Sequence, residues 1–441
     1  MSALPLKITI PGYYDREIAY VLHVWLVQHL GNTQYELQRK ANTHFVFEGP
    51  TGKFVIQNSF FKDGDKALFD VAKIPNRCIE FRCPAYPHTL CTLFGDNQVE
   101  IVDGQLYIGA DMVASSFLLL TQWDAALGER DQMGRIRLHQ SVIGKFGLYQ
   151  RGVVNEYIAF IRYLLNTIGI SSEQKSYQAV FSCDVDTVQK YARIRNLAGA
   201  IYHSDFRLQM WNKLIKDYVS ARSDIRKDPY FSFEYIIAQL QKNNTPAIFY
   251  FMTGKTNAKY DHIDYDVEST TMKHVFKLLQ ECGYEIGLHP SFESWKSEEI
   301  LNIEKVILER AIGREITSVR QHYLRYEPGK TWAMQEKLGF ETDSSVQFTE
   351  GLGFAAGICT PYKLYDLPGR RMMHIEEQPL ILMKKKDYVK NVDQQYTNYT
   401  ALLAEARKHN GRFQVLFHNS DVETDNEKKL FEATLSFLTL Q

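Results

Sequence analysis

Four segments of the sequence place acidic, basic and imidazole side chains directly after runs that are typical of β-strands. Asp184 and Asp186 follow YQAVFS, and His289 follows YEIGL. Further along the chain, Arg320 closes ITSV and His418 closes FQVLF. Two carboxylates one residue apart, together with an imidazole from another strand, suit a divalent ion such as zinc bound through Asp186 and His289.

The remaining groups would supply acid and base catalysis. Asp184 stays free to accept a proton from a water molecule, whose pKa a bound metal lowers toward neutrality. His418 belongs to a different strand, and an imidazole with an ordinary pKa of about 6.5 suits protonation of a departing amine. This combination of groups predicts hydrolysis of an amide.

These side chains can meet only if the strands that carry them share one sheet. From residue 177 the sequence alternates strand patterns with helix patterns, which predicts parallel βαβ units. In an α/β barrel the loops after the strands open on one mouth, so we expect the polar strand ends to converge there. The predicted strands include YQAVFSCDVD, PAIFYFM, YEIGLHP, ITSVR, PLILM and RFQVLFHN, and the helices between them include STTMKHVFKLLQECG and SEEILNIEKVILERAIG.

The first part of the chain has a different pattern. Residues 16–31 place apolar side chains at helical spacing and end at Gly31, which predicts an amphipathic helix. FVFEGP, GKFVIQNSFF, NRCIEFRC and VEIVDGQLYIG alternate as half-buried strands do, and ADMVASSFLLLTQWDAAL returns to a helical pattern. A length of 441 residues exceeds what one core usually organises. We therefore predict an N-terminal accessory α+β domain over 1–170 and a (β/α) barrel over 171–441.

Composition narrows the class of partner. Lys and Arg total 51 against 52 Asp and Glu, so no net positive field favours nucleic acid or anionic lipid. The N-terminus lacks a secretory signal pattern and no apolar stretch approaches the roughly 20 residues that span a bilayer, so we expect a cytoplasmic protein without membrane contact. The six cysteines are then expected to be free thiols. Cys78, Cys83, His88 and Cys91 lie close in sequence, but their spacing is not that of a zinc knuckle, and we interpret them as buried structural residues.

The ordered set of motifs resembles the NodB-type polysaccharide deacetylases, in the branch whose first motif reads D-x-D. FSCDVDT, GYEIGLHPSFES, SVRQHYLRY and VLFHNS are similar to its four motifs, over roughly residues 177–441. The resemblance implies a distorted (β/α) barrel of the carbohydrate deacetylase type, a carbohydrate substrate and a divalent metal, zinc above others. It also implies that Asp184 is the base, Asp186 and His289 are metal ligands, Arg320 orients the catalytic carboxylate and His418 is the acid.

A second resemblance concerns the N-terminal region. GADMVASSFLLLTQWDAALGERDQMGRIR resembles the end of an uncharacterised domain that precedes deacetylases of this type in bacteria. The pairing supports the assignment of the second region but adds no chemistry.

Three positions depart from the family pattern. Glu293 stands where the second metal histidine is usual, and it either coordinates the metal or turns outward and leaves the ion weakly held. Ala355 stands where relatives have a basic residue, and Lys384 where an acidic one is usual. We interpret His322 and His374 as structural or rim residues, and the acidic stretch DHIDYD, residues 261–266, as a solvated loop that lacks the pattern of an EF-hand.

Three functions are therefore compared. The first is a metal-dependent hydrolase that acts on linear amides and removes N-acetyl groups from a saccharide or glycan precursor. The second is a metal-independent amide hydrolase on the same fold. The third is a non-catalytic carbohydrate-binding protein whose site has decayed, for which Glu293, Ala355 and Lys384 argue.

Overall fold

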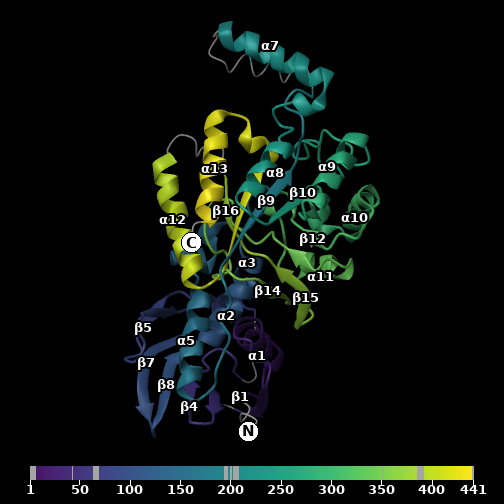
Figure 1. Ribbon diagram of the computed structural model, residues 1–441. Coiled ribbons are helices and arrows are strands. Elements are labelled where there is room, and N and C mark those ends of the chain that lie inside the picture. The colour runs from purple at the N-terminus through teal and green to yellow at the C-terminus, as the bar shows by residue number, and fades with distance from the viewer. Residues whose placement is uncertain are drawn as a thin grey trace.

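The computed structural model describes residues 6–41, 43–62, 69–192, 197–198, 201, 208–350, 352–384 and 392–439. Two sheets, each flanked by helices, follow one another along the chain, with the N-terminal sheet at the bottom of Figure 1 and the larger sheet above it. Within these residues no helix combines the length and the apolar character that crossing a lipid bilayer requires.

The N-terminal sheet has six strands in the order β2-β1-β3-β4-β8-β7. Asp103 and Gly104 both have positive φ and form the tight turn of the hairpin β7–β8, as the DG dipeptide predicts. The strands are β1 (Leu6–Pro11), β2 (Tyr35–Lys40), β3 (Phe45–Gly49), β4 (Gly52–Ile56), β7 (Gly95–Val102) and β8 (Gln105–Ala110), with a separate pair β5 (Ile79–Phe81) and β6 (Leu90–Thr92).

The helix predicted over 16–31 is present, although its second half is wound more loosely. It begins as an α-helix and continues as a π-helix up to Gly31, whose φ of +65° ends it. The helices of this region are α1 (Asp15–Leu22), η1 (His23–His29), α2 (Met112–Thr121), α3 (Trp123–Leu127), α4 (Val142–Lys145) and α5 (Val153–Thr167), with short 3-10 turns η2 (Val71–Lys73), η3 (Leu138–Gln140) and η4 (Leu148–Gln150).

The larger sheet has nine strands in the order β14-β15-β13-β12-β11-β10-β9-β17-β16. All neighbours are parallel except the edge pair β14–β15, so alternating strands and helices are confirmed. The strands are β9 (Gln178–Val185), β10 (Ala247–Phe251), β11 (Glu285–Leu288), β12 (Ser318–Val319), β13 (Thr342–Asp343), β14 (Tyr362–Asp366), β15 (Arg371–Glu377), β16 (Leu380–Met383) and β17 (Arg412–His418).

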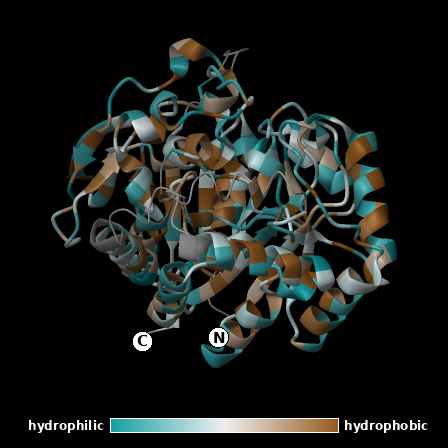
Figure 2. Cartoon of the chain, turned by 90° about the horizontal axis from the view of Figure 1, so that it is seen from above, coloured by the Kyte–Doolittle hydropathy of each residue, from teal (hydrophilic) through white to brown (hydrophobic). Residues whose placement is uncertain are grey.

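Helices cover the outside of this curled sheet, and Figure 2 shows hydrophobic residues concentrated on the central strands. Helix α7 projects away from the body at the top of Figure 1. The helix predicted over 188–203 lies largely outside the described residues. The helices are α7 (Leu208–Ser223), α8 (Phe233–Lys242), α9 (Thr270–Glu281), α10 (Glu298–Ile312), α11 (Lys330–Lys337), α12 (Val392–Lys408) and α13 (Asp425–Thr439), with short turns η5 (Ile225–Lys227), η6 (Ser294–Lys296), η7 (His322–Leu324) and η9 (Asn419–Val422).

The sheet is a curled half-barrel, so the predicted parallel α/β architecture is present, while a complete barrel is not confirmed. Among the described strands, the edges β14 and β16 do not pair with each other. The segment between β13 and β14 occupies the gap, where Gly353 donates a backbone hydrogen bond to Ile381 of β16. N-terminal residues hold this segment in place, because Phe354 donates to the carbonyl of Tyr149 and Val154 donates to that of Gly357.

The two sheets share one continuous hydrophobic core. Tyr20 of α1 and Phe117 of α2 contact Tyr365 of β14, with ring centroids 4.9 and 5.4 Å away. Glu17, which is fully buried, accepts hydrogen bonds from Tyr365 and Arg370. The N-terminal helices therefore brace the antiparallel edge of the larger sheet.

Candidate active site

The polar residues at the strand ends meet at one edge of the larger sheet, as the sequence predicts. Asp184 lies near the end of β9, His289 follows β11, Arg320 follows β12 and His418 ends β17. The carboxyl ends of parallel strands share one edge, so residues up to 234 positions apart are brought together. Asp186 lies one residue beyond β9 and completes the group.

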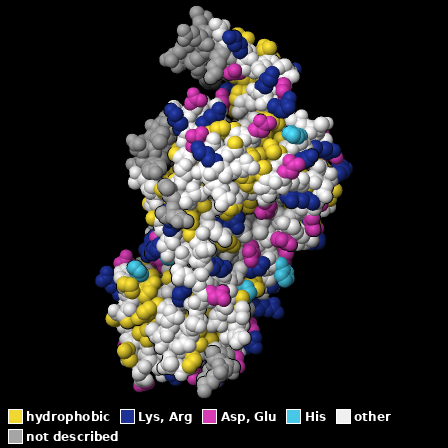
Figure 3. All heavy atoms as spheres, viewed as in Figure 1, with side chains coloured by type: hydrophobic (Ala, Val, Ile, Leu, Met, Phe, Trp, Pro, Cys, Tyr) yellow, Lys and Arg dark blue, Asp and Glu magenta, His cyan; other side chains and the backbone are white. Residues whose placement is uncertain are grey.

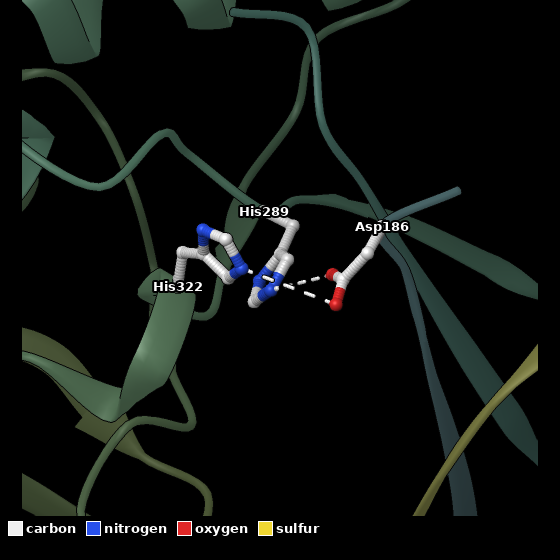
Figure 4. Close-up of side chains that lie close together, drawn as sticks. All are labelled: Asp186, His289 and His322. Carbon is white, nitrogen blue, oxygen red and sulfur yellow. Dashed lines mark ion pairs between the residues drawn. The ribbon is translucent and has the colours of Figure 1, made fainter. Parts of the chain in front are cut away.

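Asp186, His289 and His322 form a cluster that can hold a metal ion (Figure 4). One ligand atom from each residue lies within 4.8 Å of the others. The Nε2 atom of His289 is 3.3 Å from Oδ1 of Asp186, and Nε2 of His322 is 3.9 Å from Oδ2. Oδ1 of Asp186 is buried and has no hydrogen-bond partner, as expected of an atom that awaits a ligand.

The donor set therefore fits a zinc-type ion, but the third residue differs from the one that the sequence suggested. Glu293 lies outside the cluster, with its carboxylate 2.7 Å from Nζ of Lys296 and 4.0 Å from Arg325. The expectation that Glu293 binds the metal thus finds no support here. His322, interpreted from the sequence as a structural or rim residue, occupies the third position instead.

The imidazoles of His289 and His322 each have a second polar partner at Nδ1, which fixes the orientation of the ring. Nδ1 of His289 lies 2.7 Å from the carbonyl oxygen of Arg320, and Nδ1 of His322 lies 3.0 Å from Oδ1 of Asp261. Each ring then presents Nε2 to Asp186, which is the arrangement that metal-binding histidines commonly have. Asp261 is fully buried and accepts backbone hydrogen bonds from Thr256, Asn257 and Phe292.

This finding corrects the interpretation of DHIDYD as a solvated loop at its first acid, Asp261, whereas His262 and Asp266 are exposed as expected. Burial favours the neutral acid, but the hydrogen bond to His322 and the backbone donors outweigh it and lower the pKa of Asp261 to about 2. The next acid of the loop is also engaged, since Asp264 accepts hydrogen bonds from the backbone of Val188 and Gln189.

The turn that carries His322 is strained. Tyr323 and Leu324 have φ values of 61° and 55°, a left-handed conformation that bulky residues rarely adopt. Each costs about 1–3 kcal/mol and persists because the surrounding structure imposes it. The strain accompanies the position of His322, whose Nε2 lies 3.9 Å from Oδ2 of Asp186.

Asp184 is held by Arg320 at the floor of the site. Both are buried, and NH1 of Arg320 donates to Oδ1 of Asp184 at 2.8 Å. Arg320 also donates to Ser182 and to Ser344, and its guanidinium lies over the ring of Tyr250 at 4.4 Å. The second oxygen of Asp184, Oδ2, faces Nε2 of His289 at 3.8 Å.

The charges in the cluster reinforce one another. Burial favours neutral Asp186, but the close contact with the imidazole of His289 and the charges of His322 and His418 outweigh it and lower the pKa of Asp186. Burial also lowers the pKa of His289, yet the carboxylates of Asp184 and Asp186 outweigh that effect and raise it. The group is a compact network of compensating charges. The side chain of Asp186 remains 30% exposed.

His418 approaches the same carboxylate oxygen of Asp186 as His322 does. Its Nε2 is 3.8 Å from Oδ2 of Asp186, and its Nδ1 is 3.1 Å from Oδ2 of Asp421. Burial favours the neutral ring, but the hydrogen bond to Asp421 and the surrounding carboxylates raise the pKa of His418 to about 9. Nζ of Lys384 lies 2.9 Å from Oδ1 of Asp421.

All three positions that depart from the family pattern have defined contacts in the structure. Lys384 replaces the usual acid, but Asp421 supplies a carboxylate to His418 and Lys384 holds that carboxylate in place. His322 lies in the cluster that could hold a metal, whereas Glu293 lies outside it and pairs with Lys296. Ala355 is buried, and its carbonyl accepts a hydrogen bond from Gln122, so it serves the contact between the N-terminal region and the larger sheet.

Comparison with known proteins gives a family match for the N-terminal region only. Residues 6–169 match the model of a family of unknown function (DUF7033). No curated protein matches the chain.

Solved structures resemble part of the chain. A protein described as a polysaccharide deacetylase from Mycobacterium smegmatis has a TM-score of 0.39 and 13% identity, over 61% of this chain and 87% of that chain. A protein with the same description from Pseudomonas aeruginosa has a TM-score of 0.36 and 10% identity, over 58% and 84% of the two chains. A CE4 family pseudoenzyme from Bacillus anthracis has a TM-score of 0.28 and 9% identity, over 60% of each chain.

Proposed function

We propose that this protein is a metal-dependent amidohydrolase that removes N-acetyl groups from a saccharide or glycan precursor. The observation that carries the proposal is the convergence of Asp186, His289 and His322 beside a carboxylate fixed by Arg320 and an imidazole fixed by Asp421. These are the parts that hydrolysis of an amide needs: a metal site, a base and an acid.

Asp186, His289 and His322 would hold the divalent ion, and two imidazoles with one carboxylate favour zinc. When bound, such an ion polarises the amide carbonyl and lowers the pKa of a water molecule. The substrate class follows from the NodB resemblance, whose motif positions Asp184, Asp186, His289, Arg320 and His418 all lie in the site.

The chain's own groups move the protons. Asp184 takes a proton from the attacking water on Oδ2, because Arg320 occupies Oδ1. The oxygen of that water forms a bond to the acetyl carbon, and the carbon–nitrogen bond breaks. Nε2 of His418 donates a proton to the departing amine, while Asp421 keeps the ring turned toward the site through Nδ1. The products are acetate and a free amino sugar.

The test is acetate release from N-acetylglucosamine oligosaccharides by protein of known metal content. We expect activity that a chelator abolishes and zinc restores, and a loss of about 10²–10⁴-fold in Asp184→Asn. Glu293→Gln is the matched control, because Glu293 is an acid near the site but outside the cluster. Circular dichroism and metal content show whether each variant still folds and loads.

Two results would overturn the proposal in different ways. Acetate release that a chelator leaves unchanged, but that Asp184→Asn abolishes, would identify a metal-independent amide hydrolase. Oligosaccharide binding without acetate release, equal in the wild type and in Asp184→Asn, would identify a carbohydrate-binding protein without activity.

A further inference from the structure

A narrow cavity lies between the N-terminal region and the larger sheet, away from the candidate active site. It is lined by one face of α5, the end of η1, the loop at Thr360 and the end of α12. The cavity lies at the edge of the larger sheet opposite to the candidate active site. Strand β17 runs from Arg412 at the edge near the cavity to His418 at the edge that carries the site. Arg412 and His418 are six positions apart along β17, which corresponds to about 20 Å. The lining residues are His29, Asn155, Ile158, Ala159, Arg162, Lys175, Thr360, Lys408, His409 and Asn410.

The cavity wall holds cations and no carboxylate. Arg162 and Lys175 line it, and among the described residues no carboxylate lies within ion-pair distance of either. Nε of Arg162 is buried and has no hydrogen-bond partner. Lys408 also lines the cavity, but its Nζ lies 3.4 Å from the carboxylate of Glu405, so its charge already has an acidic partner. A partly buried guanidinium without a counter-charge is costly, and a bound anion would offset that cost.

Two acids near the cavity, Glu156 and Glu405, are already engaged elsewhere. Glu156 binds both nitrogens of the Arg151 fork, at 3.1 and 2.7 Å. Glu405 accepts hydrogen bonds from the backbone of Gly152 and from His409. Neither carboxylate lines the cavity, so among the described residues the charges of Arg162 and Lys175 have no acidic partner, whereas Lys408 and His409 pair with Glu405.

A second, wider cleft continues from the cavity. It shares Lys175, Thr360 and Asn410 with the cavity and adds Arg412, whose Nε is also buried without a partner. The volume open to water is about 40 Å³ in the cavity and about 470 Å³ in the cleft. The first has room for a few waters or one tetrahedral oxyanion, and the second for a larger group attached to it.

His29 offers a neutral donor or acceptor in the same wall. It is 4% exposed, and its Nε2 lies 3.3 Å from the hydroxyl of Thr360. Burial, together with the charges of Lys175 and Arg162, lowers the pKa of His29 to about 3. Burial is the largest cause of this fall in pKa, and the charges of Lys175 and Arg162 add to it.

We propose that this cavity is a binding site for an oxyanion of the phosphate type, held by Arg162 and Lys175, with Arg412 in the adjoining cleft meeting the remainder of a phosphorylated small molecule. Guanidinium and ammonium groups are the side chains that bind such anions most strongly. The site is independent of the proposed amidohydrolase activity, because no residue of the candidate active site lines it.

The test is thermal unfolding of the full chain titrated with inorganic phosphate, against sodium chloride at the same ionic strength. We expect a saturable rise in the melting temperature with phosphate alone, and an apparent affinity about tenfold weaker in Lys175→Met and in Arg162→Met. Lys53→Met removes an exposed cation from β4 and should behave as the wild type. A parallel titration with glycerol phosphate shows whether the site takes the free ion or a phosphorylated molecule. If glycerol phosphate binds more tightly than inorganic phosphate, and Arg412→Met removes that difference, the ligand is a phosphorylated molecule. Equal binding of the two indicates the free ion.

A second measurement keeps the proposal testable if Arg162→Met does not fold. Phosphate should shift the ring resonances of His29 in the NMR spectrum of the wild type, and Lys175→Met, which changes an exposed side chain, should require about tenfold more phosphate for the same shift. The proposal is overturned if phosphate has no effect beyond that of chloride. It is equally overturned if Lys53→Met and Lys175→Met respond alike.

Discussion

Asp421 joins His418 to Lys384 through its two oxygens, with Oδ2 3.1 Å from Nδ1 of the imidazole and Oδ1 2.9 Å from Nζ of the lysine. Lys384 has Glu427 as a second partner at 3.0 Å. Asp421 thus carries the negative charge that orients His418. Lys384 binds the other oxygen of the same carboxylate. The lysine at this position leaves His418 with a carboxylate partner, because that carboxylate comes from the turn after β17.

The first prediction concerns the pH dependence of activity in Asp421→Asn. The carboxylate of Asp421 raises the pKa of His418, so the acid form persists to higher pH and activity falls as pH rises through that pKa. Removing the charge lowers the pKa, so the basic limb of the pH–rate profile should move to lower pH and kcat at pH 8 should fall about tenfold or more. Asp425→Asn changes an exposed acid at the start of α13 and is the control. An unshifted basic limb would show that Asp421 does not act through His418.

The second prediction separates His322 from Glu293. Nε2 of His322 belongs to the ligand cluster, whereas Glu293 pairs with Lys296. His322→Gln should therefore lower zinc affinity by at least about tenfold and reduce activity in parallel, while Glu293→Gln should change neither. Equilibrium dialysis with zinc measures the affinity without depending on turnover. Loss of zinc from Glu293→Gln but not from His322→Gln would assign the third ligand to the glutamate after all.

The third prediction tests the buried partner of His322. Asp261 accepts from Nδ1 of the ring and is itself fixed by three backbone donors, so it sets which nitrogen faces Asp186. Asp261→Asn should weaken zinc binding by about 10–100-fold, as loss of such partners typically does. Asp266→Asn alters another acid of the same loop and should leave zinc affinity unchanged. Equal zinc affinity in the wild type and in Asp261→Asn would remove Asp261 from the site.

Sequence reasoning placed the site where strand periodicity was strong. Asp184, His289, Arg320 and His418 each follow a buried run of strand residues, and parallel pairing then dictates that their strand ends share one edge. His322 was missed because it is two residues beyond Arg320 in an irregular turn. Periodicity says nothing about where such a turn points, although its closeness to a strand end was a usable signal.

Other parts of the fold depend on contacts that are distant in sequence. The hairpin β14–β15 was not predicted, and its packing is governed by Tyr20 and Phe117 from the N-terminal region. The open gap beside β16 is likewise filled by a segment that Tyr149 and Val154 hold. Local propensity cannot reveal such tertiary contacts. The charged surface, by contrast, agrees with the composition, since Figure 3 shows both signs of charge mixed over the visible face.

The last prediction concerns the pH dependence of stability at Glu304 of α10. This side chain is 3% exposed and accepts hydrogen bonds from the backbone and hydroxyl of Ser291, so it anchors the loop that follows His289. Burial raises the pKa of Glu304 from 4.5 to about 7. The hydrogen bonds from Ser291 and the charge of His289 oppose this rise in pKa, whereas the charge of Asp261 adds to it. The folded state therefore binds more protons than the unfolded state between these two values. The contribution of Glu304 to stability is present below pH 4.5 and is lost as pH rises through 7, a difference of roughly 3 kcal/mol.

Glu304→Gln keeps the shape and an acceptor but removes the titration. The wild type should lose stability relative to this variant between pH 5.5 and pH 8.5, as measured by the urea midpoint at each pH, and the variant should be the more stable protein at pH 8.5. Glu299→Gln changes an exposed acid of the same helix and should follow the wild type at both values. If wild type and Glu304→Gln instead lose stability in parallel across this range, the carboxylate is ionised in the folded protein throughout. The anchoring of the loop after β11 would then rest on a charged, not a neutral, side chain.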